Sequence, residues 1–313
     1  MQFEFEIKEI QNKIDELTRF SEEKEIDLSD EINKLKDQRD IALKVLYDDL
    51  SDWQRVSVSR HPLRPYTLDY IDMITEDFVE LHGDRLFRDD PAIVGGLCKI
   101  GGKKFMVIGH QKGRTMKEKV FRNFGMANPE GYRKALRLFE MAERFNIPVL
   151  TFIDTPGAYP GLEAEKHGQG EAIARNLMEM SGLKTPIISI VIGEGGSGGA
   201  LGLGVADKVF MLENSTYSVI SPEGCAAILY KDPSKTEEAA NNLKISSHSL
   251  LEVGLIDGII DEALGGAHRD PECTAFNLKK IVLETIEELE KIPLEVLLEN
   301  RYNKFREMGI FYQ

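Results

Sequence analysis

A glycine-rich stretch at residues 191–200 is the part of the chain whose residue types point most directly to chemistry. Its sequence, Val191-Ile-Gly-Glu-Gly-Gly-Ser-Gly-Gly-Ala200, holds five glycines in seven residues and follows an apolar run, Ile187–Ile192, that is typical of a buried strand. Glycines let backbone N–H groups approach a ligand without obstruction by a side chain. Two such groups aimed at one point bind a phosphate or stabilise a developing oxyanion.

Two nucleotide-binding patterns fit this stretch only in part. A P-loop is excluded, because Gly199 is followed by Ala200-Leu and not by Lys-Ser/Thr. A dinucleotide fingerprint, G-x-G-x-x-G, is met at residues 193–198, with Glu213 about twenty residues further on. The helix expected at residues 199–207 spans only about two turns, however, which is short for a crossover between parallel strands.

A hydrolase pattern, G-x-S-x-G, is also met at residues 195–199. Ser197 is then followed by Asp257 and His268, the chain order of an α/β-hydrolase triad. The chain shows less strand–helix alternation before Ser197 than that fold requires. A turn that merely packs a helix against a sheet is the remaining alternative, although five glycines exceed what packing needs.

A second glycine-containing loop follows another apolar run. Val149–Ile153 has the composition of a buried strand, and it leads into Ile153-Asp-Thr-Pro-Gly-Ala-Tyr-Pro-Gly161. Because ligands bind at the carboxyl ends of parallel strands, two such loops on neighbouring strands are expected to form one site.

Basic residues are concentrated in the middle of the chain. Between Lys103 and Arg144 there are eleven Lys or Arg against four Glu, a local excess of seven positive charges. The helix expected around residues 133–144 explains part of this excess as a solvated face. For Gln111-Lys-Gly-Arg114, which follows a strand, we expect contact with an anionic ligand or with an acidic partner surface.

The elements that position these residues follow from the hydrophobic pattern. Residues 1 to about 50 predict two amphipathic helices, the second opened by Ser29 as its N-cap, and prolines in Arg60–Pro65 predict a linker. Strands alternating with helices from about Ala92 predict an α/β domain. The expected strands are Ile93–Ile100, Phe105–Ile108, Val149–Ile153, Ile187–Ile192, Val209–Leu212 and Ser218–Ile220, and the expected helices are Asp69–Leu81, 129–145, 168–182 and the segment from about Thr274.

The composition excludes several classes of protein. No apolar run reaches the length of a membrane span, and the acidic N-terminus is neither a signal nor a transit peptide, so we expect a cytoplasmic protein. Cys98, Cys225 and Cys273 are isolated, which argues against a zinc site and a disulfide framework. The net charge of −14 makes nucleic acid an unexpected partner.

Eight long motifs follow one another along the chain: Arg64–Tyr70, Gly109–Arg114, Arg122–Met126, Pro129–Arg137, Phe152–Gly161, Ile192–Ala200, Ser218–Cys225 and Leu264–Arg269. Together they resemble one family, the alpha subunit of the bacterial-type acetyl-CoA carboxylase carboxyltransferase. The resemblance extends from the N-terminal helices to the last helix.

This resemblance implies a crotonase-like (ClpP/crotonase) α/β fold, a superhelix of repeated strand–strand–helix units, with an N-terminal helical arm and C-terminal helices. The arm is expected at residues 1–60 and the carboxyltransferase domain at residues 61–313. The implied reaction moves a carboxyl group from carboxybiotin to acetyl-CoA and forms malonyl-CoA for fatty acid synthesis. The chain has no Met-Lys-Met biotin-attachment site, so the family's biotin carboxyl carrier protein must supply the carboxybiotin.

The resemblance also implies partners and site residues. Two alpha chains assemble with two beta chains, biotin carboxylase belongs to the wider complex, and zinc is expected only in the beta subunit, with no metal in this chain. Gly198 and Gly199 are expected to give the backbone N–H pair that faces the biotin ureido oxygen. The expected carboxybiotin pocket adds Gly157, Ala158, Gly195 and Gly196, and the expected contacts with a coenzyme A phosphate or the beta chain are Lys112 and Arg114.

Overall fold

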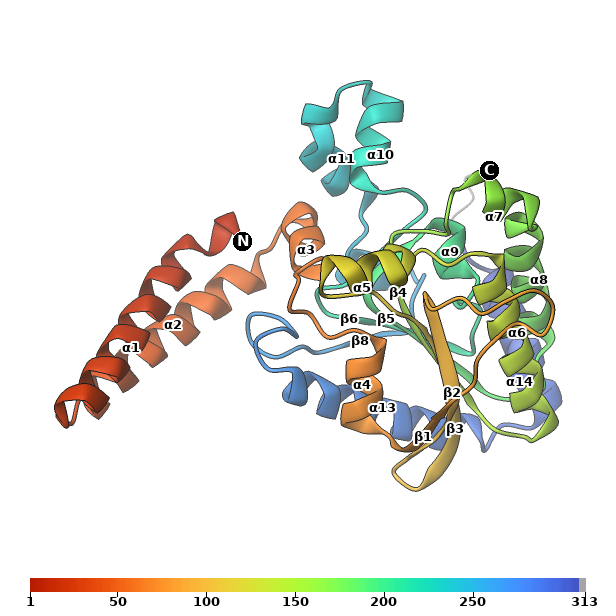
Figure 1. The fold of residues 1–313 in the computed structure, drawn as a ribbon, viewed down its shortest axis with the longest axis horizontal. Coiled ribbons are helices and arrows are strands. Elements are labelled where there is room, and N and C mark those ends of the chain that lie inside the picture. Colours follow the sequence, from red (N-terminus) through yellow and green to blue (C-terminus); the bar gives the residue numbers. More distant parts are fainter. Residues whose placement is uncertain (310–313) are drawn as a thin grey trace.

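One mixed sheet forms the centre of the molecule (Figure 1). Within residues 1–309, which the computed structural model describes, eight strands are ordered β1-β2-β3-β4-β5-β6-β8, and β7 pairs with the end of β5. The first three strands are antiparallel, and β3, β4, β5, β6 and β8 run parallel. The strands are β1 Glu76–Glu80, β2 Ile93–Ile100, β3 Lys103–His110, β4 Val149–Thr155, β5 Ile187–Gly196, β6 Lys208–Leu212, β7 Thr216–Ser218 and β8 Gly258–Ile260.

Helices cover both faces of this sheet, which buries its parallel strands on both sides. One apolar core lies under α6 and α8 and includes Leu138 and Met180; the other lies under α4 and α13 and includes Tyr70 and Leu278. The helices are α1 Phe5–Lys24, α2 Ser29–Asp48, α3 Asp52–Ser59, α4 Thr67–Ile74, α5 Met116–Phe121, α6 Pro129–Arg144, α7 Leu162–Lys166, α8 Gln169–Gly182, α9 Ser197–Leu201, α10 Pro222–Cys225, α11 Thr236–Leu243, α12 Ser247–Glu252, α13 Pro271–Leu289 and α14 Leu294–Arg306. Short 3-10 or π turns lie at Gln2–Glu4, Asn123–Gly125, Ala226–Tyr230 and Pro233–Lys235.

The two strands that precede the glycine loops lie side by side at the centre of the sheet. All seven residues of β4 are buried, and β4 pairs with β5 from Val149 opposite Ile187 to Thr155 opposite Gly195. The strand expected at Ile187–Ile192 is therefore confirmed, and it continues to Gly196. Parallel pairing brings both loops to the same edge of the sheet, as the sequence predicted.

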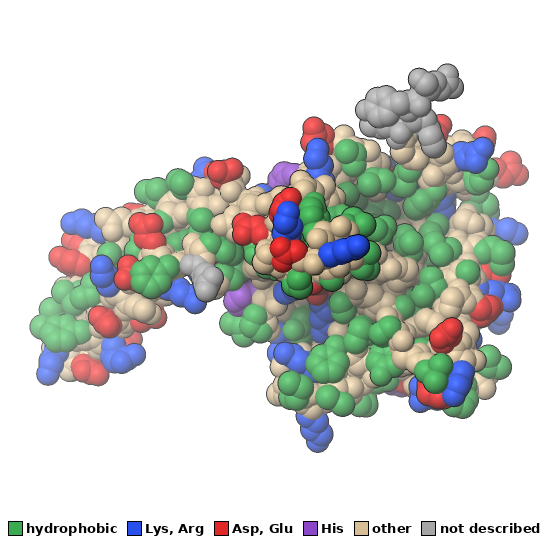
Figure 2. Space-filling view, turned by 90° about the horizontal axis from the view of Figure 1, so that it is seen from above, with side chains coloured by type: hydrophobic (Ala, Val, Ile, Leu, Met, Phe, Trp, Pro, Cys, Tyr) green, Lys and Arg blue, Asp and Glu red, His purple; other side chains and the backbone are tan. Residues whose placement is uncertain are grey.

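The two N-terminal helices that the hydrophobic pattern predicted pack against each other, and they extend away from the sheet (Figure 1). Their small core contains Ile7 and Leu43 and continues into Val58 of α3. A buried ion contact ties them to the body, because Glu4 accepts hydrogen bonds from Tyr47 at 2.8 Å and from Arg269 at 2.7 Å. Acidic and basic side chains are intermixed along the outer surface of the pair (Figure 2).

The helix expected at Asp69–Leu81 was wrong in its second half. Helix α4 ends at Ile74, and Glu76–Glu80 forms the edge strand β1, which pairs antiparallel with β2. Charged and apolar residues in this segment fit a helical period as well as a strand period. Pairing with β2 decides in favour of the strand, because it satisfies the backbone hydrogen bonds of Glu76–Glu80.

Two smaller expectations also need correction. The strand expected at Ser218–Ile220 lies two residues earlier, as β7 at Thr216–Ser218, where it extends the pairing of β5. Ser29 is the first residue of α2 and not its N-cap; the carboxylate of Asp27 accepts hydrogen bonds from the Ser29 backbone and hydroxyl.

The last third of the chain adds a protrusion and two long helices. Helices α10 and α11 project from the body above the sheet, around a small core that includes Cys225 and Ala239 (Figure 1). Helix α13 covers one face of the sheet, and Arg301 of α14 is buried in an ion pair with Asp207 at 2.7 Å. Within residues 1–309, no helix combines the length and the apolar composition that crossing a membrane would require.

Candidate active site

The two glycine loops touch each other. A Cβ atom added to Gly199 would lie 2.5 Å from the Ala158 nitrogen and 2.6 Å from the Gly157 carbonyl carbon. A Cβ atom on Gly196 would lie 2.2 Å from the Pro156 carbonyl oxygen. Only glycine lets the backbones approach so closely. The structure therefore brings together the residues that the sequence predicted as one site.

Local contacts fix the loop after β4. The Thr155 hydroxyl accepts a hydrogen bond from the Gly157 N–H at 3.1 Å and donates one to the Gly157 carbonyl at 2.7 Å. Gly157 has φ +151°, a backbone conformation that residues with a Cβ atom rarely adopt. The Tyr159 N–H donates to the Ala127 carbonyl at 3.0 Å. This loop consequently has little freedom to move away from Gly199.

Helix α9 begins with the residues that the sequence predicted as an N–H pair. Ser197 opens the helix with φ +52°, an uncommon backbone conformation for a residue with a side chain. Gly198 and Gly199 follow in the first turn, where backbone N–H groups have no partner within the helix. A Cβ atom on Gly198 would meet only methyl groups of Ile173, at 3.8 Å. Space beside Gly198 is therefore open, whereas Gly199 is closed in by Gly157 and Ala158.

A chain of ion pairs, buried at Asp154 and exposed at Arg60 and Glu223, connects the strands that carry the loops. The Lys112 Nζ lies 2.7 Å from Asp154 Oδ1 on β4 and 2.9 Å from Glu194 Oε2 on β5. The other oxygen of Glu194 lies 2.6 Å from Arg60 Nε, and Arg60 also pairs with Glu223 at 2.5 Å. Burial by itself would raise the pKa of Glu194, but the charges of Lys112 and Arg60 outweigh burial and lower this pKa to about 2.

Lys112 and Arg114 therefore have partners within the chain. Burial opposes the charge of Lys112, yet Asp154 and Glu194 raise the pKa of the ammonium above its usual range. Arg114 lies 2.5 Å from Asp69 and stacks over the Tyr66 ring at 4.7 Å. Contact of either residue with coenzyme A or a partner stays a prediction. The geometry adds a second role for Lys112, which is to hold β4 and β5 together.

Sequence reasoning missed His110, at the end of β3. Its side chain is fully buried, and both ring nitrogens lack a hydrogen-bond partner of good geometry. Burial, reinforced by the charge of Lys112, lowers the pKa of His110 to about 3, although the nearby backbone of Phe152 and of Gly199 opposes the shift. A neutral imidazole thus lies behind the loop that carries Gly199. A lone histidine at a strand end gives no signal of such burial.

We expect the free energy of unfolding to fall as the pH drops below about 6.5, with a contribution from His110. The unfolded chain takes up a proton near pH 6.5, and the folded chain only near about 3, so the unfolded chain binds more protons in between. Between these two pH values, each pH unit lowers the free energy of unfolding by about 1.4 kcal/mol. Urea unfolding at pH 7, 6 and 5 measures how steeply the free energy of unfolding falls with pH. In His110→Gln this slope should be smaller by the contribution of one proton. The matched control is His82→Gln at an exposed position, and equal slopes in the three proteins would contradict the assignment.

The other patterns that the sequence raised are not supported by the described residues. Asp257 forms an ion pair with Lys304 and accepts a hydrogen bond from the Val209 N–H, and His268 stacks on His61 with ring centroids 3.8 Å apart, so neither partners Ser197. Helix α9 has five residues, which is too short for the crossover helix of a dinucleotide-binding unit.

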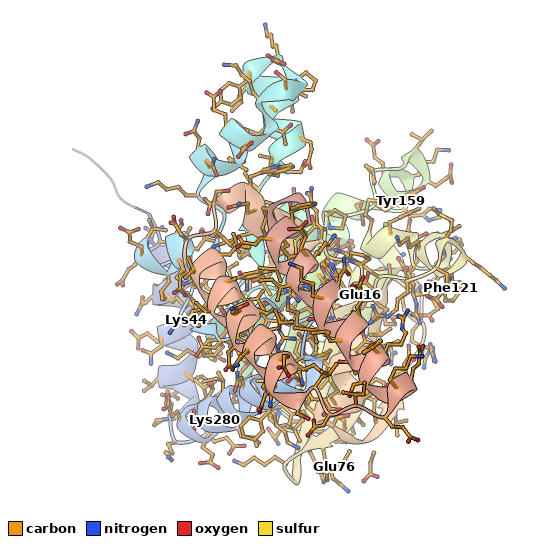
Figure 3. The ribbon with its side chains drawn as sticks, turned by 90° about the vertical axis from the view of Figure 1, so that its left-hand side faces the viewer. Glu16, Lys44, Glu76, Phe121, Tyr159 and Lys280 are labelled. Atoms are coloured by element: carbon orange, nitrogen blue, oxygen red, sulfur yellow. The ribbon has the colours of Figure 1, made fainter. Side chains whose placement is uncertain are left out.

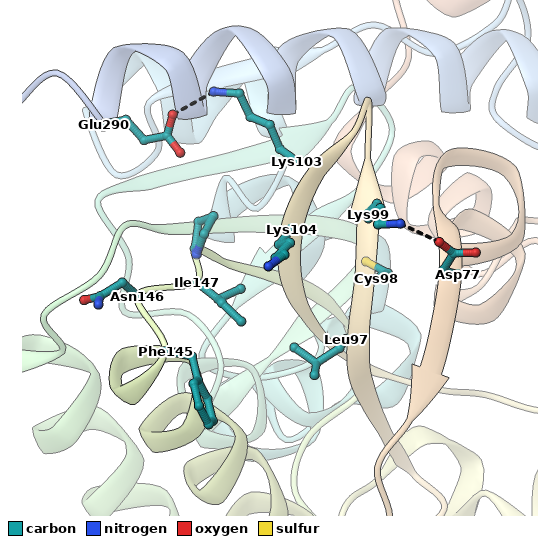
Figure 4. Close-up of a pocket in the computed structure, with 11 residues that line it drawn as sticks. Asp77, Leu97, Cys98, Lys99, Lys103, Lys104, Phe145, Asn146, Ile147 and Glu290 are labelled. Atoms are coloured by element: carbon teal, nitrogen blue, oxygen red, sulfur yellow. Dashed lines mark hydrogen bonds and ion pairs between the residues drawn. The ribbon is translucent and has the colours of Figure 1, made fainter.

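A cavity of about 890 Å³ lies at the opposite edge of the sheet (Figure 4). Lys103 begins β3 and Pro148 precedes β4, so this cavity is at the amino ends of the parallel strands. Two of its lysines are engaged by the chain's own carboxylates: Lys99 pairs with Asp77 and Lys103 with Glu290, each at 2.7 Å. The cavities near the glycine loops are smaller: about 240 Å³ beside Glu194, about 360 Å³ beside Ser197, and about 30 Å³ between Pro156 and Gly195–Gly196.

Solved structures with the same fold include a transcarboxylase, a subunit of a carboxylase and a decarboxylase. The beta subunit of geranyl-CoA carboxylase from P. aeruginosa is 20% identical with a TM-score of 0.57, over 78% of this chain and 46% of that subunit. Transcarboxylase 12S gives a TM-score of 0.53 at 20% identity, over 68% of this chain and 41% of the other. A Pseudomonas malonate decarboxylase hetero-tetramer gives a TM-score of 0.55 at 17% identity, over 69% of this chain and 88% of that chain. The expected crotonase-like α/β fold is confirmed.

Sequence comparison is more specific. The acetyl-coenzyme A carboxylase carboxyl transferase subunit alpha of Fusobacterium nucleatum is 83% identical over 311 residues, which cover 99% of each chain. The subunit of the same name from Methylococcus capsulatus is 55% identical over 99% of this chain and 97% of its own. A family model described as acetyl co-enzyme A carboxylase carboxyltransferase-like matches residues 1–309. With this match over almost its full length, the chain belongs to the acetyl-coenzyme A carboxylase carboxyltransferase family.

Proposed function

We propose that this chain is the alpha subunit of an acetyl-CoA carboxylase carboxyltransferase, which transfers a carboxyl group from carboxybiotin to acetyl-CoA and forms malonyl-CoA. The observation that carries the proposal is the 83% identity, over the full chain, to a relative of that name. The product, malonyl-CoA, is used in fatty acid synthesis, which places the activity in lipid metabolism.

The glycine loops suit the charges that develop in this reaction. When carboxybiotin releases its carboxyl group, negative charge grows on the ureido oxygen of the biotin ring. Backbone N–H groups fixed in a site that excludes water stabilise such an oxyanion. We assign this role to Gly198 and Gly199. The contacts of Gly199 and Gly196 with the Pro156–Ala158 backbone support a pocket that also includes Gly157, Ala158 and Gly195.

No side-chain acid or base is required by this scheme. The nitrogen anion left on the biotin ring can itself remove the methyl proton of acetyl-CoA, whose thioester oxygen then carries charge. We propose that the beta subunit provides the N–H pair for that second oxygen. His110 is closed off from solvent behind the Gly199 loop, so its burial is consistent with a role in shaping the loop and not in transferring a proton.

The relatives' designation as a subunit alpha, together with a hetero-tetrameric structural neighbour, supports a multi-subunit complex. We propose two alpha and two beta chains, with a biotin carboxyl carrier protein that delivers carboxybiotin and biotin carboxylase in the wider assembly. Zinc would be held by the beta subunit. We further propose that residues 1–60 are an arm for contact with partners and that residues 61–313 carry the transferase site. Exposed Phe5, Ile41 and Val45 on the helical pair support the first part.

The test is the reverse half-reaction, decarboxylation of malonyl-CoA in the presence of a free biotin derivative. It is run with this chain alone, with a beta subunit from the same genome alone, and with the mixture. Activity confined to the mixture, and lost in Gly198→Val without loss of assembly, is the expected result. Full activity of a well-assembled Gly198→Val complex would overturn the role of the loop and favour a scaffolding role for this chain.

A further inference from the structure

Helix α5, Met116–Phe121, is fixed in place and yet buries none of its side chains. Met116, Val120 and Phe121 are 69%, 59% and 60% exposed, and Figure 3 shows Phe121 at the outer edge of the molecule on the same side as Tyr159. An isolated helix of six residues is unstable in water. Its persistence in this position needs a cause in the contacts around it.

Three hydrogen bonds and one close packing contact hold α5. The Thr115 hydroxyl accepts a hydrogen bond from the Glu118 N–H at 3.2 Å, and the Glu118 carboxylate accepts from the backbone of Thr115 and of Arg114. This reciprocal arrangement is a capping box, which stabilises the start of a helix. Gly113 packs directly on the α5 backbone: a Cβ atom there would lie 2.3 Å from the Lys119 nitrogen. The helix thus presents its apolar side chains to solvent on a fixed support.

Ion pairs within the chain account for part of the basic excess around this helix. Lys103, Lys112, Arg114, Arg133 and Lys134 all pair with carboxylates of the chain. Lys117 and Lys119 of α5 do not: within residues 1–309, neither ammonium lies within 4.0 Å of a carboxylate. On a chain with a net charge of −14, α5 combines two uncompensated cations with three exposed apolar side chains.

This surface adjoins the candidate active site. Met116 and Lys119 line the cavity of about 240 Å³ that is also lined by Lys112 and Glu194. Glu194 directly precedes Gly195 and Gly196 of the glycine loop. A protein seated on α5 would therefore lie close to Glu194, the residue before the glycines of the loop that we assign to carboxybiotin.

We propose that α5 is the docking surface for an acidic, partly apolar face of the protein that carries the biotinyl group; this rests on the proposed function. A stable subunit interface buries about 800 Å² on each partner, whereas six residues of a single helix offer far less. A small basic and apolar surface suits a partner that must bind and leave in each turnover. Lysines at such a surface accelerate association and lose their effect as salt screens them.

The experiment uses the assembled complex and two forms of the same substrate, the biotinylated carrier protein and a free biotin derivative. Lys117→Glu/Lys119→Glu is expected to raise the KM for the carrier protein by at least about fivefold and to flatten its salt dependence. Rates with the free biotin derivative should stay within about twofold, because that substrate needs no docking surface. Lys280→Glu/Lys291→Glu is the matched control, since it reverses two exposed lysines that lie outside both α5 and the N-terminal arm.

Four other results are possible, and each would contradict the docking proposal in a different way. An unchanged KM for the carrier protein would exclude α5 as its docking surface. An equal loss with both substrates would assign Lys117 and Lys119 to the catalytic site or to the local fold. Loss of assembly with the beta chain would make the beta subunit the occupant of this surface. Inactivity of the unmodified complex with both substrates would overturn the proposed function, and the docking proposal with it.

Discussion

Replacing Gly199 with alanine is expected to lower the rate of carboxyl transfer by at least about a hundredfold, the loss typical of removing one donor of an oxyanion hole. The added Cβ atom would lie 2.5 Å from the Ala158 nitrogen and 2.6 Å from the Gly157 carbonyl carbon. Both are backbone atoms held by the contacts of Thr155 and Ala127, so the loops must separate. Overpacking of this kind also costs about 1–3 kcal/mol of stability. The measurements are the decarboxylation rate and the free energy of unfolding.

The matched control is Gly182→Ala, at the end of α8, where an added Cβ atom meets nothing within 4 Å. It tests the same chemical change at an open position, and both measurements should stay near those of the unmodified protein. Full activity and unchanged stability of Gly199→Ala would show that the two loops are not packed as described and would remove the geometric support for the proposed N–H pair.

The sequence predicts the central strands and the meeting of the glycine loops because both depend on local patterns. Val149–Ile153 and Ile187–Ile192 are continuous apolar runs, as expected for strands buried on both faces. The loops follow directly from those strands, and parallel order places them at one edge. The family motifs add the roles of Gly198 and Gly199, which spacing alone leaves open between phosphate binding, nucleophilic catalysis and an oxyanion hole.

Features that depend on pairing between distant segments could not be predicted in this way. The strand at Glu76–Glu80 exists through its hydrogen bonds with β2, and its charged residues conceal it. The basic excess around Lys112 suggested a surface for anions. The structure shows that Asp154 and Glu194, forty or more residues away, take up the charge of Lys112, whereas Lys117 and Lys119 of α5 have no carboxylate within 4.0 Å among the described residues. No periodicity relates a lysine to carboxylates on two other strands.

Replacing Lys112 with methionine is expected to destabilise the protein by about 3–5 kcal/mol, because removing one partner leaves buried carboxylates without their counter-charge. Asp154 and Glu194 would then face each other at the ends of β4 and β5, next to the loops. We expect the rate of carboxyl transfer to fall by about a hundredfold as the N–H pair is displaced. Urea unfolding and the decarboxylation assay measure the two effects.

The pH dependence distinguishes this positioning role from direct binding of coenzyme A. In the unmodified protein the pKa of Glu194 is lowered to about 2, so its contribution to stability is present above about pH 4.5 and is lost as the pH falls toward 2. Without Lys112, Glu194 binds a proton more readily, and the stability lost at pH 7 should be partly recovered near pH 5. Lys166→Met, which removes an exposed ion pair with Glu163, should cost less than about 1 kcal/mol at either pH. If Lys112 instead binds a phosphate of coenzyme A, Lys112→Met should raise the KM for malonyl-CoA while the free energy of unfolding and its pH dependence stay unchanged.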